Sequence, residues 1–221
     1  MLFQRLIQKN SEVWCQYLDH NFVKGLKEGT LNKENFLFYL KQDYMYLINY
    51  SKCYARLALN ANTVEELRFA IKFQNYTLEG ELELHKSILE LGIDTSNFNE
   101  KDESLVNIAY SRYILGVGEN GDFLDMLIAL SACAIGYGYI GSKIYKDISK
   151  EKLQNHPYKE WILTYSSQEF QASVKEFENF VNSYTEQISE EKFNKLSKIF
   201  YNVVRLEIAF WEHSLKMEIN I

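Results

Sequence analysis

The sequence predicts an all-α protein that folds as a single-domain helical bundle. Pro157 is the only proline in 221 residues, and apolar residues recur at spacings of three and four along nearly the whole chain. Few helix breakers and an apolar stripe of helical period are typical of long amphipathic helices around a core. Because this length is within the range of one domain, we expect a single domain over residues 1–221.

We expect about seven main helices separated by short connections. Asn32 is placed to cap the long second helix, and Thr63 with Glu66 forms a capping box for the third. Pro157 is placed to open the sixth helix, and Ser189 to cap the seventh. The predicted helices cover about residues 2–18, 33–60, 63–92, 102–115, 123–145, 157 onward and 190–217, with a connector at 22–30, a polar loop at 93–100 and a glycine-rich turn at 116–121.

Charge and hydropathy exclude several classes of function. The formal net charge of -6 argues against nucleic acid or an acidic membrane surface as a partner. The N-terminus has no signal-peptide pattern. The longest apolar stretch, at 123–135, is interrupted by Asp125 and is too short to span a bilayer. We therefore expect a soluble, cytoplasmic protein that binds neither nucleic acid nor a membrane.

The cysteines and aromatic residues limit the kinds of site that we expect in this chain. Cys15, Cys53 and Cys133 are three in number, with no CxxC or Cys/His cluster, so we expect neither disulfides nor a bound metal. Sixteen tyrosines and fourteen phenylalanines fit either a pocket for a flat, polar heterocycle or simply an aromatic core. Both interpretations stay open at the level of composition.

Cys133 is the cysteine whose neighbours in the sequence are compatible with a reactive thiol. Cys15 and Cys53 are interpreted as small buried hydrophobes. Cys133 lies among small residues on a predicted helix, and Tyr137, four residues later, shares its face. The pattern fits a buried structural thiol or a reactive thiol with room for a ligand beside the sulfur.

Asp43 is the first of two carboxylates predicted on aromatic helix faces. It shares its face with Tyr46 and Tyr50. If that face points inward, the carboxylate must have a partner, and such a buried group indicates a functional use. The alternative is that Asp43 lies at the surface or pairs with Lys41 or Arg56.

Glu207 is the second carboxylate, on the last helix. It shares a face with Trp211, four residues later, and an aromatic, water-poor environment raises the pKa of a carboxyl group, as a general acid near neutral pH requires. The alternative is a local ion pair with Arg205 or a solvated side chain. The segment at 161–170, which contains Tyr165, is interpreted as inward-facing aromatic sequence.

Two familiar motifs are rejected. Residues 136–141 match GxGxxG, but that pattern binds dinucleotides only between a strand and a helix, and here it lies inside a helical pattern. A di-iron bundle needs Glu-x-x-His pairs, which none of the four histidines supplies. The acidic run at 79–85 is interpreted as a polar helix face.

Six motifs follow one another at compatible spacings over nearly the whole chain. They are Phe22-Val23-x-Gly25-x-x-x-Gly29-Thr30-Leu31, Phe36-x-x-Tyr39-x-x-Gln42-Asp43-Tyr44-x-Tyr46-Leu47, Glu81-x-x-x-His85, Cys133 with Tyr137, Trp161-Ile162-x-x-Tyr165-Ser166-Ser167-x-Glu169-Phe170, and Glu207-x-x-Phe210-Trp211. In this order they resemble the TenA/thiaminase II family, and the first and last motifs are the most specific.

The resemblance implies a heme-oxygenase-like helical fold, a homotetramer, and cofactor-free hydrolysis of thiamin or of 4-amino-5-aminomethyl-2-methylpyrimidine. Cys133 implies the cysteine-containing branch of the family. On this resemblance we expect a catalytic group, in which Cys133 is the nucleophile, Glu207 the proton donor and Tyr46 the residue that orients the thiol. The expected pyrimidine-binding residues are Asp43, Tyr137, Tyr165 and Tyr110.

Some residues depart from the family pattern. Arg205 places a positive charge close to Glu207 in the sequence. Ala134 and Gly136 are smaller than the residues often found at these positions in the family, so they affect the expected shape of the pocket. Three alternatives stay open. The first is a non-catalytic module of the same fold that holds a flat ligand such as a tetrapyrrole, with His20 as an axial ligand. The others are a regulatory or scaffold protein and a hydrolase of a different aminopyrimidine.

Overall fold

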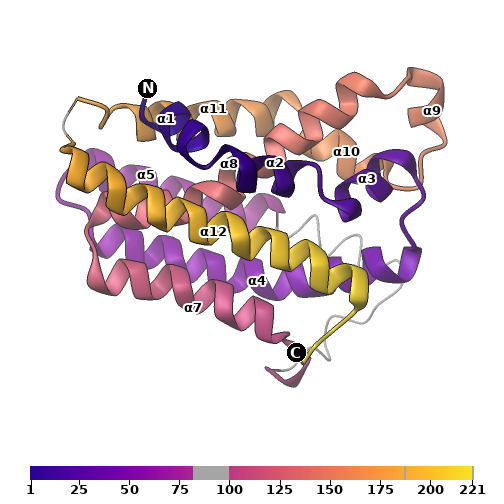
Figure 1. Ribbon diagram of the computed structural model, residues 1–221, viewed down its shortest axis with the longest axis horizontal. Helices are drawn as coiled ribbons and strands as arrows, with labels where there is room; N and C mark the ends of the chain where they lie inside the picture. The colour runs from indigo at the N-terminus through magenta and orange to yellow at the C-terminus, as the bar shows by residue number, and fades with distance from the viewer. Residues whose placement is uncertain (82–99, 187, 221) are drawn as a thin grey trace. The chain divides into compact units, whose positions relative to one another are not determined.

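The computed structural model describes residues 1–81, 100–186 and 188–220, and every regular element in these ranges is helical (Figure 1). The all-α prediction is therefore confirmed over the described residues. The elements are α1 (Leu2–Lys9), α2 (Ser11–Leu18), α3 (Asn21–Glu28), α4 (Lys33–Leu59), α5 (Val64–Tyr76), the π-helix η1 (Thr77–Glu81), the 3₁₀ turn η3 (Glu100–Asp102), α7 (Leu105–Asn120), α8 (Phe123–Asp147), α9 (Lys150–Gln154), α10 (Lys159–Tyr165), α11 (Gln168–Asn182) and α12 (Glu190–Lys216).

The N-terminal third is divided into more helices than the sequence pattern predicted. The first predicted helix breaks at Asn10, whose φ of -118° and ψ of 29° are not helical, and becomes α1 and α2. The predicted connector at 22–30 is largely helix α3. His20 caps it, because its Nδ1 accepts the backbone N–H two residues later at 3.2 Å. Gly29 ends it in the left-handed region at φ 74°.

Two of the predicted caps are confirmed by their hydrogen bonds. Glu66 N–H donates to Thr63 Oγ1 at 3.1 Å, and Thr63 N–H donates to the Glu66 carboxylate at 3.1 Å, so the capping box of α5 is complete. Ser189 Oγ accepts from the N–H of Lys192 at 3.1 Å. Asn32 stands at the start of α4 but makes no side-chain cap bond.

The predicted glycine turn at 116–121 is wrong, because α7 continues to Asn120. The Gly118 carbonyl near the end of α7 accepts Nε and Nη2 of Arg56, both at 3.2 Å, and Nδ2 of Asn60 at 2.7 Å. These donors from the last turn and C-cap of α4 satisfy a carbonyl near the C-terminal end of α7, where helix carbonyls lack partners within the helix.

The start of α10 differs from the prediction. Pro157 lies in the turn before α10, which begins at Lys159, so the proline precedes this helix and is not its first residue. The predicted end of the third helix at residue 92 and the predicted loop from 93 to 99 lie outside the described residues.

Contacts divide the chain into two compact units, and the boundary crosses α8 and α12. Unit 1 comprises Met1–Leu31 and Ile128–Trp211, and unit 2 comprises Asn32–Leu127 and Glu212–Ile221. The prediction of one domain over residues 1–221 stays a prediction.

In unit 1, α1 packs against α11. Met1 offers no side-chain cap to α1. The first N–H groups of the helix donate instead to distant side chains: Leu2 N–H to Thr185 Oγ1 at 2.9 Å and Phe3 N–H to Asn182 Oδ1 at 3.0 Å. The position of α1 is thus fixed by hydrogen bonds as well as by its apolar face.

In unit 2, α4 packs against both α5 and α7, and the three helices lie side by side (Figure 1). Gln42, in the middle of α4, is fully buried. Its side chain donates to the Asp102 carbonyl at 2.7 Å and accepts the Ser104 N–H at 2.9 Å, while Asn107 Nδ2 donates to the Gln42 carbonyl at 2.8 Å. This hydrogen-bonded cluster holds the start of α7 against α4 beside Asp43.

Helix α8 is the most apolar element among the described residues. Contrary to the prediction, it is long and apolar enough to cross a membrane, with a mean hydropathy of 1.7 in its best window, but 89% of that window is buried inside the structure. Asp125 does not interrupt the helix; its carboxylate accepts Asp122 N–H at 3.0 Å in the first turn. By its burial, α8 is a core helix of this structure.

Candidate active site

The seven predicted site residues are all buried and fall into two groups, one in each unit. Unit 1 holds Cys133, Tyr137, Tyr165 and Glu207, and unit 2 holds Asp43, Tyr46 and Tyr110. That the two groups share one cavity stays a prediction.

Tyr137 lies in the middle of an aromatic cluster in unit 1. Helix α8 places it one turn after Cys133, and the Cys133 side chain is 7% exposed. The Tyr137 ring lies 5.1 Å from Tyr165 and 5.3 Å from Trp211, and Tyr165 lies 4.5 Å from Trp161 (centroid distances). The prediction that 161–170 carries inward-facing aromatic residues is confirmed for Trp161 and Tyr165. Helices α8, α10 and α12 therefore each contribute to one aromatic cluster.

Tyr17 of α2 is a neighbour of this cluster that the sequence did not predict. A Cβ on Gly136 would lie 2.4 Å from Tyr17 Cε1 and 2.7 Å from its hydroxyl, so the ring occupies the space that a side chain at position 136 would fill. Tyr17 is fully buried, and its ring stacks with Trp211 at 6.2 Å and 17°. The expectation that small residues leave open room beside Cys133 is therefore wrong at Gly136. A glycine inside a helix amid large rings was the available signal of such a neighbour.

The glycines of the rejected GxGxxG motif serve close packing. They lie inside α8, and a Cβ on Gly141 would lie 2.5 Å from Cβ of Tyr165 and 2.7 Å from its backbone carbon. The absence of a side chain lets the end of α10 approach α8. The prediction that this segment lies inside a helix is confirmed.

Glu207 is 1% exposed, so a solvated side chain is excluded. Trp211, one turn later in α12, is fully buried and stacks with Phe22 at 4.8 Å and 13°. Arg205 is exposed, and its Cζ lies 5.6 Å above the ring of Tyr201. Side chains two positions apart on a helix point in nearly opposite directions. Arg205 thus lies on a different face of α12 from Glu207.

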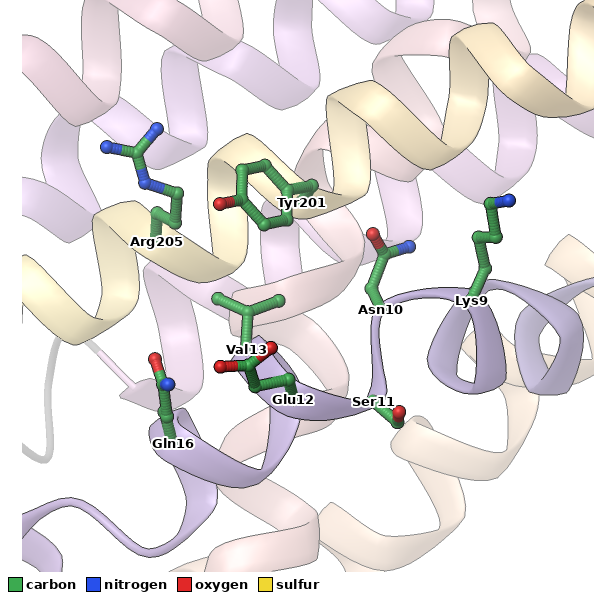
Figure 2. Close-up of a pocket in the computed structure, with 8 residues that line it drawn as sticks. All are labelled: Lys9, Asn10, Ser11, Glu12, Val13, Gln16, Tyr201 and Arg205. Carbon is green, nitrogen blue, oxygen red and sulfur yellow. The ribbon is translucent and has the colours of Figure 1, made fainter.

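Arg205 instead lines a surface pocket of unit 1 between α1, α2 and α12, which Figure 2 shows. The pocket has a volume of about 410 Å³. Its lining residues are Lys9, Asn10, Ser11, Glu12, Val13, Gln16, Tyr201 and Arg205. None of the seven predicted site residues belongs to it.

Asp43 in unit 2 is 3% exposed, so of the two alternatives that the sequence left open, its face of α4 points inward. Asp43 Oδ2 accepts a hydrogen bond from the Tyr39 hydroxyl at 3.1 Å. The alternative cationic partners have other contacts. Lys41 pairs with Asp102 at 3.1 Å, and Arg56 donates to the Gly118 carbonyl. Because Asp43 is 3% exposed, the alternative that places it at the surface is wrong.

Tyr46 belongs to a row of tyrosine rings in unit 2. Its ring stacks with Tyr50 at 5.3 Å and with Tyr110 of α7 at 4.8 Å. The Tyr54 hydroxyl donates to the Tyr50 hydroxyl at 3.4 Å. Tyr110, which was predicted from the family resemblance alone, is thus in contact with Tyr46.

The other two cysteines differ from each other. Cys53 is fully buried as predicted, and burial raises the pKa of its thiol from 9.0 to about 12, which makes it unreactive near neutral pH. Cys15 is exposed, so its interpretation as a buried hydrophobe is wrong.

Histidines and acidic residues are the remaining side chains that could bind a metal or a tetrapyrrole. His20, the axial ligand of the tetrapyrrole alternative, uses Nδ1 to cap α3. Within the described ranges, no group of three or more His, Cys, Asp or Glu side chains is arranged to hold a metal ion. His85 of the Glu81-x-x-x-His85 motif, and with it most of the acidic run at 79–85, lies outside these ranges.

Comparison with known proteins gives a family match over nearly the whole chain. A model described as the TENA/THI-4/PQQC family matches residues 7–217. An uncharacterized protein of Haemophilus influenzae is 34% identical, covering 98% of this chain and 100% of that protein. Aminopyrimidine aminohydrolases of Halalkalibacterium halodurans and Helicobacter pylori are 32% and 31% identical, covering 94% and 95% of this chain and 92% and 96% of their own lengths.

Solved structures agree with this match. A TenA family transcription regulator from Silicibacter is 32% identical, with a TM-score of 0.89 over 97% of this chain and 96% of that one. A Shewanella denitrificans domain of unknown function with a heme oxygenase-like fold has a TM-score of 0.76 at 17% identity, covering 97% and 92% of the two chains. The predicted heme-oxygenase-like fold is thereby confirmed.

Proposed function

Because the chain belongs to the TENA/THI-4/PQQC family, we propose that it is a cofactor-free hydrolase of thiamin salvage. The proposed reaction converts 4-amino-5-aminomethyl-2-methylpyrimidine and water to the hydroxymethylpyrimidine and ammonia, and thiamin is proposed as a second substrate. Support comes from the two aminopyrimidine aminohydrolases, which match over more than nine-tenths of this chain.

The observation that carries the proposal is that unit 1 holds Cys133 together with a buried carboxyl group and an aromatic cluster. The sulfur is buried one turn from Tyr137, in the unit that also holds the buried Glu207 and an aromatic cluster. A thiol and a carboxyl group in aromatic surroundings suit nucleophilic attack followed by proton transfer on a flat heterocycle. Of the three cysteines, Cys53 is inert through burial and Cys15 is exposed.

In the proposed mechanism the Cys133 thiolate adds to C6 of the pyrimidine. The ring electrons then expel the amine from the methylene at C5, and Glu207 donates the proton that the departing amine takes as ammonia. Water adds to the exocyclic methylene, Glu207 takes up its proton, and the thiolate leaves to restore the aromatic ring. The covalent adduct divides one difficult displacement into easier steps.

The proposal gives the tyrosines and Asp43 the task of binding and orientation. Tyr46 would hydrogen-bond the thiol and favour thiolate, and Asp43 would accept hydrogen bonds from the amino edge of the pyrimidine. Tyr137, Tyr165 and Tyr110 would provide the walls for the ring. This arrangement requires that the residue groups of the two units face a common cavity.

The test is ammonia release from the aminomethylpyrimidine, run beside thiamin cleavage. We expect Cys133→Ser to lose nearly all turnover while it still binds the pyrimidine, and Glu207→Gln to lose turnover by at least about a hundredfold, as for a general acid–base group. Cys15→Ser is the matched control, since that thiol is exposed, and should equal the parent. Comparable rates in Cys133→Ser and the parent would reject the covalent step.

A homotetramer in the cytoplasm is part of the proposal. Helix α5 supports assembly, because Val64, Leu67 and Ile71 form an apolar stripe along it that is 63%, 39% and 44% exposed, and such patches mark interaction surfaces. Light scattering coupled to gel filtration measures the mass, and a monomer would reject the assembly.

A regulatory role is the second candidate, favoured by the name of the Silicibacter relative, a transcription regulator. The net charge of -6 opposes direct contact with DNA. Sequence-specific DNA binding at physiological salt, without ammonia release from any aminopyrimidine, would favour this role over hydrolysis.

A further inference from the structure

We infer that Tyr39 is a positioning residue for Asp43, and that its hydroxyl fixes the carboxylate for recognition of the aminopyrimidine. The inference rests on the proposed function and deepens it. The two residues lie four apart in α4, so their side chains share a face. Tyr39 Oη donates to Asp43 Oδ2 over 3.1 Å, and the side chains are 0% and 3% exposed.

The Tyr39 hydroxyl is placed to set the orientation of the Asp43 carboxylate. The last torsion of an aspartate has a broad, roughly two-fold distribution, so the helix backbone does not by itself fix the plane of the carboxylate. A hydroxyl that donates to an ionised oxygen makes a charge-assisted bond, stronger than a neutral one. It also replaces part of the hydration that a carboxylate loses on burial.

The part of α4 around this pair is held against the start of α7. Gln42, next to Asp43 in the chain, binds that segment through its side chain and its carbonyl. The Tyr39 ring is fully buried, and its centroid lies 5.9 Å from that of Phe36 in the same helix. The backbone at Asp43 is therefore held in place, and the hydrogen bond from Tyr39 fixes the orientation of the carboxylate itself.

The position of Asp43 decides which kinetic constant Tyr39 affects. In the proposed mechanism Asp43 binds the amino edge of the ring, away from the bond that breaks. A contact that is equally strong in the ground state and the transition state contributes to KM and leaves kcat unchanged. A purely structural role for Tyr39 would instead lower the amount of active protein and so reduce kcat.

The experiment measures ammonia release from the aminomethylpyrimidine by the full chain and by Tyr39→Phe, which keeps the ring and removes the hydroxyl. We expect KM to rise about tenfold or more, with kcat within about threefold of the parent, as for loss of a hydrogen bond to a charged group. Tyr54→Phe is the matched control. It lies in the same helix, is 1% exposed, and loses a hydroxyl that donates to Tyr50, so it should keep the parent KM.

A double-mutant cycle with Asp43→Asn tests whether Tyr39 acts through the carboxylate. In the Asp43→Asn background we expect Tyr39→Phe to raise KM by less than about twofold. An unchanged KM in Tyr39→Phe, an equal rise in Tyr54→Phe, or a full further tenfold rise in the Asp43→Asn background overturns the inference and leaves the proposed function standing. A parent protein that releases no ammonia overturns both.

Discussion

Replacing Gly136 by alanine tests the packing beside Cys133. The added Cβ would lie 2.4 Å from Cε1 of Tyr17, whereas carbon atoms pack at about 3.5–4.0 Å. Either the ring or the helix must therefore move by about 1 Å. Tyr17 is fully buried, and its ring lies 5.6 Å from Trp14 and 6.2 Å from Trp211, so neither direction offers free space.

The expected cost of this overpacking is about 1–3 kcal/mol in the free energy of unfolding. For a chain of this size, that lowers the melting temperature by roughly 2–12 °C, which differential scanning calorimetry measures. Gly116→Ala is the matched control. It lies in α7 with nothing within 4 Å of its added Cβ, so it should stabilise by about 0.5–1 kcal/mol through the backbone entropy of glycine.

A second substitution tests the cause of the effect. In a Tyr17→Leu background the clash is removed, so Gly136→Ala should cost much less than it does in the parent, and the two changes should be far from additive. Melting of Gly136→Ala at or above the parent temperature, or full additivity with Tyr17→Leu, would refute the argument from close packing.

Two further predictions concern Cys53 and the start of α5. Burial raises the pKa of Cys53 from 9.0 to about 12. Its neutral thiol therefore contributes stability below pH 9 that is lost as the pH rises toward 12, and the reactive thiolate is scarce near neutral pH. Iodoacetamide followed by mass spectrometry should label the exposed Cys15 long before Cys53, and equal rates would contradict this. Thr63→Ala removes a cap bond of α5 and should lower the free energy of unfolding, measured by urea titration, by about 1 kcal/mol. Asn32→Ala loses no cap bond and should lower it clearly less in the same measurement.

Helical spacing predicted which aromatic residues share a face with each carboxylate, while the sequence left open whether those faces are buried. Asp43 was placed with Tyr46 and Glu207 with Trp211, and all four are buried. Each pairing lies within one helix, where a period of 3.6 residues is enough to assign neighbours. The capping box at the start of α5 was predictable for the same reason, since its bonds are local.

The features that the sequence did not predict depend on contacts between distant segments. Tyr17 fills the space at Gly136 across two helices, and no local pattern indicates which ring does so. The break between α1 and α2 likewise has a distant partner, because Asn10 Nδ2 at the break donates to Ser197 Oγ at 3.1 Å. The exposure of Cys15 depends on which side of α2 the other helices cover.

A crystal structure of the Cys133→Ser protein with 4-amino-5-aminomethyl-2-methylpyrimidine bound tests most directly whether the thiol and the two carboxylates serve one ligand. We expect the ring against Tyr137, with Asp43 and Glu207 each within about 2.7–3.2 Å of a ligand nitrogen. A ligand held away from position 133, or one that reaches only one of the two carboxylates, would contradict the proposed active site.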